Sequence, residues 1–325
     1  MTYADRKLRS THAIPSETAR ILGQVLSSAD TESTVRRSTV VHDAVLGINT
    51  LSIDEALRED PSALNITDGS GFSPLHWATH RGDIAAAKAL LGWGPDLAAR
   101  TNDTDGYTAL HIAASGLSPR SDEIGILLVE AGADPSEKSF PDGKTVLHIT
   151  WNGSSPKSLE FYVAVLKAGA DPNLISLTRA MGETPIKSLL SHLISYHTDN
   201  IFDKLETLLR WGADPNLCGH GEKPPIQALI QYCAWNDNSV HTSARMLEIL
   251  LDGGARLDAV HPYGFNIFQV IIHSSSRSRL QLIRVIRHRD LTGINPDSTD
   301  NWGGTALMSL RYSMTFTDDP QRHSG

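Results

Sequence analysis

The sequence predicts an all-α solenoid, in which pairs of short helices are stacked along the chain. A short motif recurs at steps that range from 35 residues, between Leu75 and Leu110, to 42 residues, between Ile226 and Phe268. A glycine-containing segment follows most copies, and the apolar residues between the two are spaced as on one face of a helix. Repeats of about 20 to 50 residues are typical of solenoids.

The composition is that of a folded soluble protein. The 325 residues are 40% hydrophobic and 20% charged, and 29 Lys and Arg against 37 Asp and Glu give a net charge of −8. This charge disfavours direct binding to nucleic acid. The N-terminus lacks a secretory signal, no apolar stretch approaches the ~18 residues of a membrane span, and there are two cysteines. We therefore expect a monomeric intracellular protein, in the cytoplasm, the nucleus or both.

Residues 1–37 are predicted to form an N-terminal arm. Ile21, Leu22, Val25 and Leu26 place an amphipathic helix within residues 15–28, and a Ser/Thr-rich linker follows. Such a helix would either cover the apolar edge of the first unit or dock on a partner, and the sequence leaves both alternatives open.

Each unit begins with a helix that has its own start signal. A hydroxyl side chain stands where an N-cap acceptor is needed, and a proline follows in two units. The cap residues are Ser73, Thr108, Thr145 and Thr184, and the prolines are Pro74 and Pro185.

The second helix of each unit ends at a glycine, the residue that most easily adopts the left-handed conformation after a helix. Gly132, Gly169 and Gly212 hold this position. Residues 303–316 supply a first helix without a second, so the repeats end on a half unit, and residues 317–325 form a polar tail.

The motifs resemble those of the ankyrin repeat. They read SPLH, TALH, TVLH and TPIK at the first helix and GADPN after the second. The resemblance covers residues 38–316, about seven units and a half unit, and weakens after residue 216, where Pro224-Pro225 replace the cap. It implies stacked helix–turn–helix units with short hairpin fingers along one edge.

Three histidines occupy matching places in the motif: His76, His111 and His148. They could be metal ligands, catalytic bases or structural residues. The resemblance implies the last of these, a hydrogen bond that ties neighbouring fingers together. Equivalent atoms of stacked units lie about 10 Å apart, whereas zinc needs ligands within about 2.1 Å, so the three cannot share one ion.

The units from residue 186 onward have extra residues between their two helices. Apolar spacing continues through Leu189, Leu190, Leu193 and Ile194, which favours extra helical turns over a loose loop. The alternative is a second contact surface built from Tyr196, His197, Trp235 and Asn236. Trp151 replaces the small residue that the ankyrin family usually has there, which indicates either a repacked core or a small pocket.

No residue is assigned a catalytic, cofactor-binding or metal-binding role. The sequence contains no phosphate-binding glycine loop and no nucleophile motif. Cys218, His220, Cys233 and His241 depart from the paired spacing of known zinc sites. We therefore predict that the protein is not an enzyme and needs no cofactor.

Residues 277–289 form a basic segment with five arginines and no acidic residue: Arg277, Arg279, Arg284, Arg287 and Arg289. If Leu280, Ile283 and Ile286 pack inward, then Arg284, Arg287 and Arg289 face outward. The segment is either a site for an anionic partner or an ordinary solvated helix face, and the second is favoured because most charge runs are of that kind.

The resemblance implies that another protein binds the concave face, which the fingers and first helices of an ankyrin stack form. Side chains after the finger glycine, or near the end of the first helix, face that side. In this sequence they are Phe72, His80, Arg81, Tyr107, Lys144, Glu183, Ser191 and His192. Phe72 and Tyr107 lie on adjacent fingers and are of the residue type enriched at interface hot spots.

The predicted function is therefore that of a non-catalytic interaction scaffold or adaptor, with a regulatory role such as transcriptional co-regulation or inhibition of a partner. The alternative is a catalytic or small-molecule-binding accessory protein of a metabolic pathway, which would use the extended region between the helices.

Overall fold

The computed structural model describes residues 38–150, 157–177, 182–192, 200–220, 222–235, 240–259, 261–272 and 276–317. The backbone alone is described for residues 192, 232–235, 240–241, 276–278 and 312–317. The predicted N-terminal arm, the tail from residue 318 and Trp151 lie outside the described residues.

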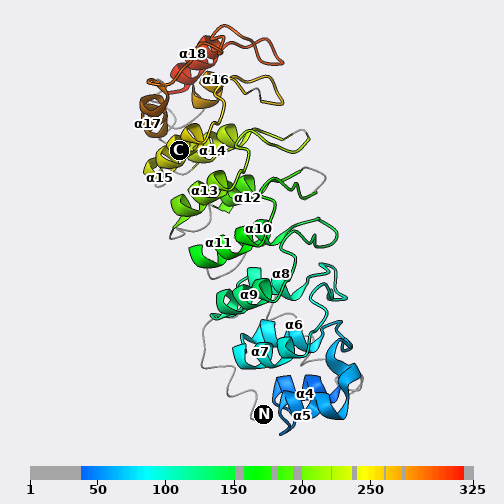
Figure 1. Ribbon diagram of the computed structural model, residues 1–325. Helices are drawn as coiled ribbons and strands as arrows, with labels where there is room; N and C mark the ends of the chain where they lie inside the picture. Colours follow the sequence, from blue (N-terminus) through cyan, green and yellow to red (C-terminus); the bar gives the residue numbers. More distant parts are fainter. Residues whose placement is uncertain are drawn as a thin grey trace, which may run out of the picture.

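The described chain forms an elongated stack of helix pairs, from α4 at one end to α18 at the other (Figure 1). The first helices are α4 (Val40–Leu46), α6 (Pro74–Arg81), α8 (Ala109–Ala114), α10 (Val146–Ile149), α12 (Pro185–His192), α14 (Pro225–Trp235), α16 (Ile267–Ile272) and α18 (Ala306–Thr317). The second helices are α5 (Ile53–Glu59), α7 (Ile84–Gly92), α9 (Ser121–Glu130), α11 (Leu159–Lys167), α13 (Ile201–Arg210), α15 (Val240–Asp252) and α17 (Ser276–Ile286), and a 3-10 helix, η1 (Pro61–Leu64), follows α5. The predicted all-α solenoid is confirmed.

The predicted helix boundaries arise from the caps. Thr39, Ser73 and Thr108 each accept the backbone N–H of the residue three positions later, at 3.3 to 3.4 Å. The predicted glycines end the second helices with φ of +96°, +96° and +89°, in the order Gly132, Gly169 and Gly212.

The segment between the second helix of one unit and the first helix of the next projects from one edge of the stack as a hairpin, which we call a finger (Figure 1). Backbone hydrogen bonds join neighbouring fingers, such as the one from the N–H of Leu177 to the carbonyl of Asp142, 2.6 Å apart. The apolar core lies between the helices. The aligned residues of the first five complete motifs are buried in it: Leu75, Leu110, Leu147, Ile186 and Ile226.

The later units are longer, in part through longer helices. α14 and α15 have 11 and 13 residues, against 8 and 9 in α6 and α7. Between α12 and α13 the extra residues, 193–199, lie outside the described part of the chain. Tyr196, His197, Asn236 and the side chain of Trp235 lie outside it too, so the second contact surface remains a prediction.

Candidate partner-binding surface

The aligned histidines connect each unit to the next finger. In His76, Nδ1 accepts the backbone N–H of Ser73 at 3.0 Å, and Nε2 donates to the carbonyl oxygen of Ala99 at 3.1 Å. Ser73 is the cap of the same helix, whereas Ala99 belongs to the following finger. One imidazole therefore stabilises a helix start and a contact between units.

The same arrangement occurs four times. The Nε2 atoms of His42, His111 and His148 lie 2.9, 3.2 and 3.0 Å from finger carbonyl oxygens, those of Phe72, Lys144 and Glu183. All four histidines are at most 1% exposed. Both ring nitrogens are occupied by backbone groups, so the structural interpretation of the three predicted histidines is confirmed.

Burial lowers the pKa of His76, His111 and His148 to about 4, and it lowers the pKa of His42 too. The charged imidazolium would lose its hydration there, and the bond to the finger carbonyl offsets only part of this loss. The rings are therefore neutral near pH 7, with the proton on Nε2.

Other polar side chains take this position in later units. Lys187 forms an ion pair with Glu222 on the next finger. Gln227 donates to the carbonyl of Ala259 at 2.5 Å, and Gln269 donates to that of Gly304 at 2.8 Å. We call these seven side chains the clamp residues: His42, His76, His111, His148, Lys187, Gln227 and Gln269.

An aromatic cluster lies on the finger and inner helix of the second unit. The ring of Phe72 lies 5.0 Å from that of Trp77 and 6.3 Å from that of His80, and Trp77 and His80 are 5.8 Å apart. Trp77 Nε1 donates to Asp68 at 2.8 Å, and the same carboxyl group accepts the backbone N–H of Phe72 at 3.0 Å. All three rings are half-buried. The cluster is thus held in a fixed arrangement with part of its surface open to solvent.

Trp77 was absent from the predicted site. It follows the clamp residue His76 directly, and His80 lies three residues further on the same helix. Side chains three apart share a helix face, so the predicted place of His80 already indicated Trp77.

The side chains of Tyr107 and Arg81 each contact another part of the stack, whereas the sequence predicted only that they face a partner. The ring of Tyr107 is stacked on that of His111, with centroids 5.5 Å apart and an angle of 11° between the planes. Arg81 is exposed, but its guanidinium donates to the carbonyl of Leu46 in the preceding unit at 2.7 Å.

Of the other predicted residues, Lys144, Glu183 and Ser191 lie in the middle of the stack and are polar. Ser191 Oγ donates to a carboxylate oxygen of Glu183 at 3.4 Å. Burial raises the pKa of Glu183, while nearby Lys144 and Lys187 oppose this rise. The side chain of His192 is not described. The predicted residues are therefore not one continuous group: Phe72 and His80 belong to the aromatic cluster, whereas Glu183 and Ser191 contact each other in the middle of the stack.

Most of the basic segment lies on α17, with Arg287, His288 and Arg289 after its end, and the orientation of the helix differs from the prediction. Leu282 and Ile286 are buried, whereas Leu280 and Ile283 are 62% and 43% exposed, so the predicted inward face of Leu280, Ile283 and Ile286 was wrong except for Ile286. The packing of α17 against α15 determines which residues of α17 face inward.

The arginines of this segment differ in their surroundings. Arg289 forms an ion pair with Asp252 at 2.8 Å, and its side chain remains 34% exposed. Arg279 donates to the carbonyl of Ile272 at 2.6 Å. Arg284 and Arg287 are exposed, and the side chain of Arg277 is not described.

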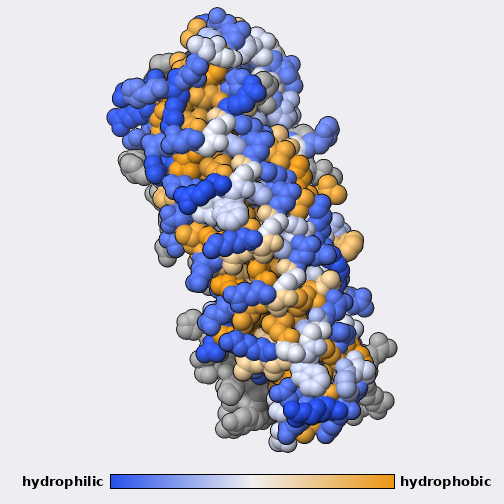
Figure 2. Space-filling model, viewed as in Figure 1, coloured by the Kyte–Doolittle hydropathy of each residue, from blue (hydrophilic) through white to orange (hydrophobic). Residues whose placement is uncertain are grey.

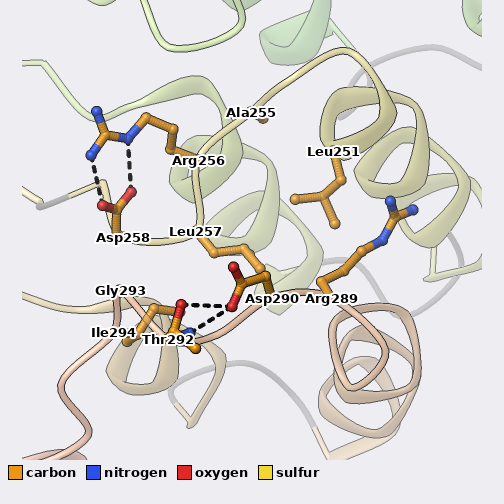
Figure 3. A pocket seen from close by; sticks show the side chains of 10 residues that line it. All are labelled: Leu251, Ala255, Arg256, Leu257, Asp258, Arg289, Asp290, Thr292, Gly293 and Ile294. Carbon is orange, nitrogen blue, oxygen red and sulfur yellow. Dashed lines mark hydrogen bonds and ion pairs between the residues drawn. The ribbon is translucent and has the colours of Figure 1, made fainter.

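A pocket of about 410 Å³ lies where α15 and α17 end (Figure 3). Arg256 pairs with both carboxylate oxygens of Asp258, at 2.9 and 2.6 Å, and Asp290 accepts the hydroxyl of Thr292 at 2.7 Å. Arg289, which lines its other side, pairs with Asp252. Since these polar groups already pair with one another, we assign the pocket no ligand.

Within the part of the chain that the structure describes, no three His, Cys, Asp or Glu residues are grouped so that they could hold a metal ion. The side chains of Cys233 and His241, which belong to the weak zinc candidate, are outside that part. The described helices also include none that is long and apolar enough to cross a membrane.

Comparisons with known proteins agree with this geometry. Residues 41–139 match a family model described as ankyrin repeats (3 copies). The chain is 34% identical over 110 residues to a transient receptor potential cation channel subfamily A member 1 homolog of Caenorhabditis elegans. It is 30% identical over 84 residues to ankyrin repeat-containing protein C6C3.08 of Schizosaccharomyces pombe. These alignments cover 34% and 26% of this chain but only 9% and 36% of the two relatives.

Among solved structures, the ankyrin repeat domain of Bcl-3, described as a unique member of the IkappaB protein family, is similar. The TM-score is 0.57, and the match covers 76% of this chain and 98% of that one. The identity is 20%, so the likeness concerns the fold alone.

Proposed function

Because the chain is an ankyrin-repeat protein, we propose that it is a non-catalytic adaptor that binds another protein on the side of its fingers and first helices. Ankyrin repeats are protein–protein interaction modules, and a stack of this kind presents a long surface rather than a closed cavity. We place the partner on the concave face, and we assign the protein a regulatory role in the cytoplasm or the nucleus.

The observation that carries this proposal is the aromatic cluster of Phe72, Trp77 and His80. Interface hot spots are enriched in Trp and Tyr, and side chains that are already held in place lose little freedom when they bind. The cluster meets this condition, because the Asp68 carboxyl group holds both Trp77 and the backbone of Phe72. Hydrophobic residues also run along one face of the stack, between hydrophilic ones (Figure 2).

The proposal is tested by affinity purification of the full chain from its native cell with mass spectrometry. We expect a stoichiometric protein partner that is lost when Phe72 and Tyr107 are both replaced by alanine. The matched control is Phe140→Ala, which removes a finger aromatic that is 63% exposed and lies outside the cluster. Thermal unfolding of each variant is measured in parallel, because Tyr107 packs on the clamp residue His111.

Retention of the partner by a folded Phe72→Ala/Tyr107→Ala variant would contradict the proposed site. Equal loss in the Phe140→Ala control would place the partner elsewhere on the fingers.

A further inference from the structure

Helix α17 exposes a face that differs from those of the other second helices. Leu280 and Ile283 are 62% and 43% exposed. Among the described side chains of α5, α7, α9, α11, α13 and α15, no large apolar residue is exposed to this extent. A solvated outer helix normally carries polar residues there, so this face has the character of an interface.

Two arginines adjoin these apolar side chains. Arg284 lies four residues after Leu280, which places it on the same side of the helix, and Arg287 follows the last residue of α17 directly. Both are exposed, and neither forms an ion pair with a described residue. Arg287 contacts only the adjacent His288 ring, 2.8 Å from its Nε.

The acidic groups of the neighbouring helix α15 pair with other arginines. Asp252 pairs with Arg289, and Glu248 pairs with Arg245 at 3.2 Å. Glu206 of α13 also lies 3.5 Å from Arg245. The positive charge of Arg284 and Arg287 is therefore not neutralised by these carboxylates.

We propose that the outward face of α17, formed by Leu280, Ile283 and Arg284, acts together with Arg287 at the end of the helix to bind an acidic amphipathic peptide segment of a partner protein. Apolar side chains of the segment cover Leu280 and Ile283, and its carboxylates pair with Arg284 and Arg287. This surface lies on a second helix, apart from the aromatic cluster, so it is a second binding site beyond the proposed adaptor surface.

The chemistry of this face favours a peptide over other anions. A nucleic-acid backbone has no apolar groups to cover Leu280 and Ile283, and the net charge of −8 repels it from the rest of the protein. Two apolar side chains bury too little area to hold a helix at a membrane surface.

The test begins with a peptide-display library selected on the full chain. We expect enriched peptides that combine at least two Asp or Glu with neighbouring Leu, Ile or Phe. One such peptide is synthesised with a fluorescent label, and its affinity is measured by fluorescence anisotropy. The affinity falls about tenfold or more in Arg284→Glu/Arg287→Glu and in Leu280→Ser/Ile283→Ser, and it decreases with added salt.

The matched control is Lys88→Glu on α7, which reverses the charge of an exposed lysine on a second helix far along the stack from α17. It should leave the affinity within about twofold, because this side chain lies on another helix. Since all the replaced side chains are exposed, thermal unfolding should remain close to that of the wild type.

Several results would overturn the inference. One is the absence of acidic peptides among those selected. Another is an affinity of Arg284→Glu/Arg287→Glu for the labelled peptide that equals that of the wild type. Tighter Arg284- and Arg287-dependent binding of a 20-base-pair duplex DNA, or of vesicles with anionic lipid, would assign the face to those ligands instead. A photo-crosslinker at position 280 that reacts within the same chain would show that the protein covers this face itself.

Discussion

The first half of the solenoid, residues 38–183, connects its fingers through histidines, whereas the second half, residues 184–317, uses one lysine and two glutamines. In both halves the clamp residue reaches the next finger from the same place in the motif. The difference teaches that the architecture requires a buried polar side chain of suitable length at this place, and that imidazole is one solution among several.

Gln269 shows how closely an amide can replace an imidazole. Its Oε1 accepts the N–H of its own cap residue, Asn266, at 2.9 Å, and its Nε2 donates to the next finger at 2.8 Å. These are the two contacts that His76 makes through Nδ1 and Nε2. The two kinds of clamp differ in one property, because only the histidine gains a proton as the pH falls.

The largest expected effect concerns pH. The pKa values of His76, His111 and His148 lie at about 4 in the folded protein, against 6.5 for an unburied histidine. Between these values the unfolded chain binds more protons than the folded one. The contribution of these histidines is therefore fully present above about pH 6.5 and is lost as the pH falls toward 4, by up to about 3 kcal/mol for each residue.

We expect the triple variant His76→Gln/His111→Gln/His148→Gln to be less stable than the wild type at pH 7 but to lose less stability on acidification. Urea unfolding of both proteins at several pH values between 7 and 4 measures the difference. Since both chains contain the same carboxyl groups, their titration cancels in this comparison. If the free energies of unfolding of the two proteins fell by the same amount on acidification, the histidines would be accessible to protons in the folded state.

The second effect separates the clamp contacts from the imidazole itself. His111→Ala leaves the carbonyl of Lys144 and the cap of α8 without their partner and creates a cavity, and should lower the free energy of unfolding by about 3 kcal/mol. His111→Gln should cost about half as much, because an amide can make both contacts. His220→Ala, which removes an exposed histidine on a finger, serves as the control and should have little effect.

Equal losses in His111→Ala and His111→Gln would show that the shape of the ring matters more than its hydrogen bonds. The analogy between the two halves of the stack would then fail.

The sequence predicted the stack and the histidines well, because both depend on contacts that recur in every unit. It did not predict Gln227 and Gln269 as clamp residues, although each follows the aligned apolar residue of its unit directly. Here the hydrogen-bonding role persists while the residue type changes, so a search for the motif letters misses it.

The phase of α17 could not be derived from the sequence. Apolar residues at positions 280, 282, 283, 285 and 286 are compatible with more than one inward face, and contact with α15 selects Leu282 and Ile286. The aromatic cluster was half predicted, since Phe72 and His80 were expected at the partner-binding side, whereas Trp77, which shares the helix face of His80, was not.

The smallest expected effect is a gain in stability at the imperfect clamp of the second half. Gln227 Oε1 is buried and has no hydrogen-bond partner among the described residues. The residue at the cap position is Pro224, which has no N–H to donate. In the next unit the equivalent Asn266 donates its N–H to Gln269 and accepts the N–H of Gln269 at 3.0 Å.

Pro224→Asn should reproduce this pair and raise the free energy of unfolding by about 1 kcal/mol. The new cap and the satisfied oxygen contribute more than the loss of the rigid proline costs in the unfolded chain. The gain should be smaller when Gln227 is also replaced by leucine, because only the backbone cap then remains, and it should not vary between pH 5 and 8, since neither amide titrates. A Pro224→Asn protein that unfolds at lower urea concentration than the wild type would mean that the proline holds the chain in a conformation on which the finger depends.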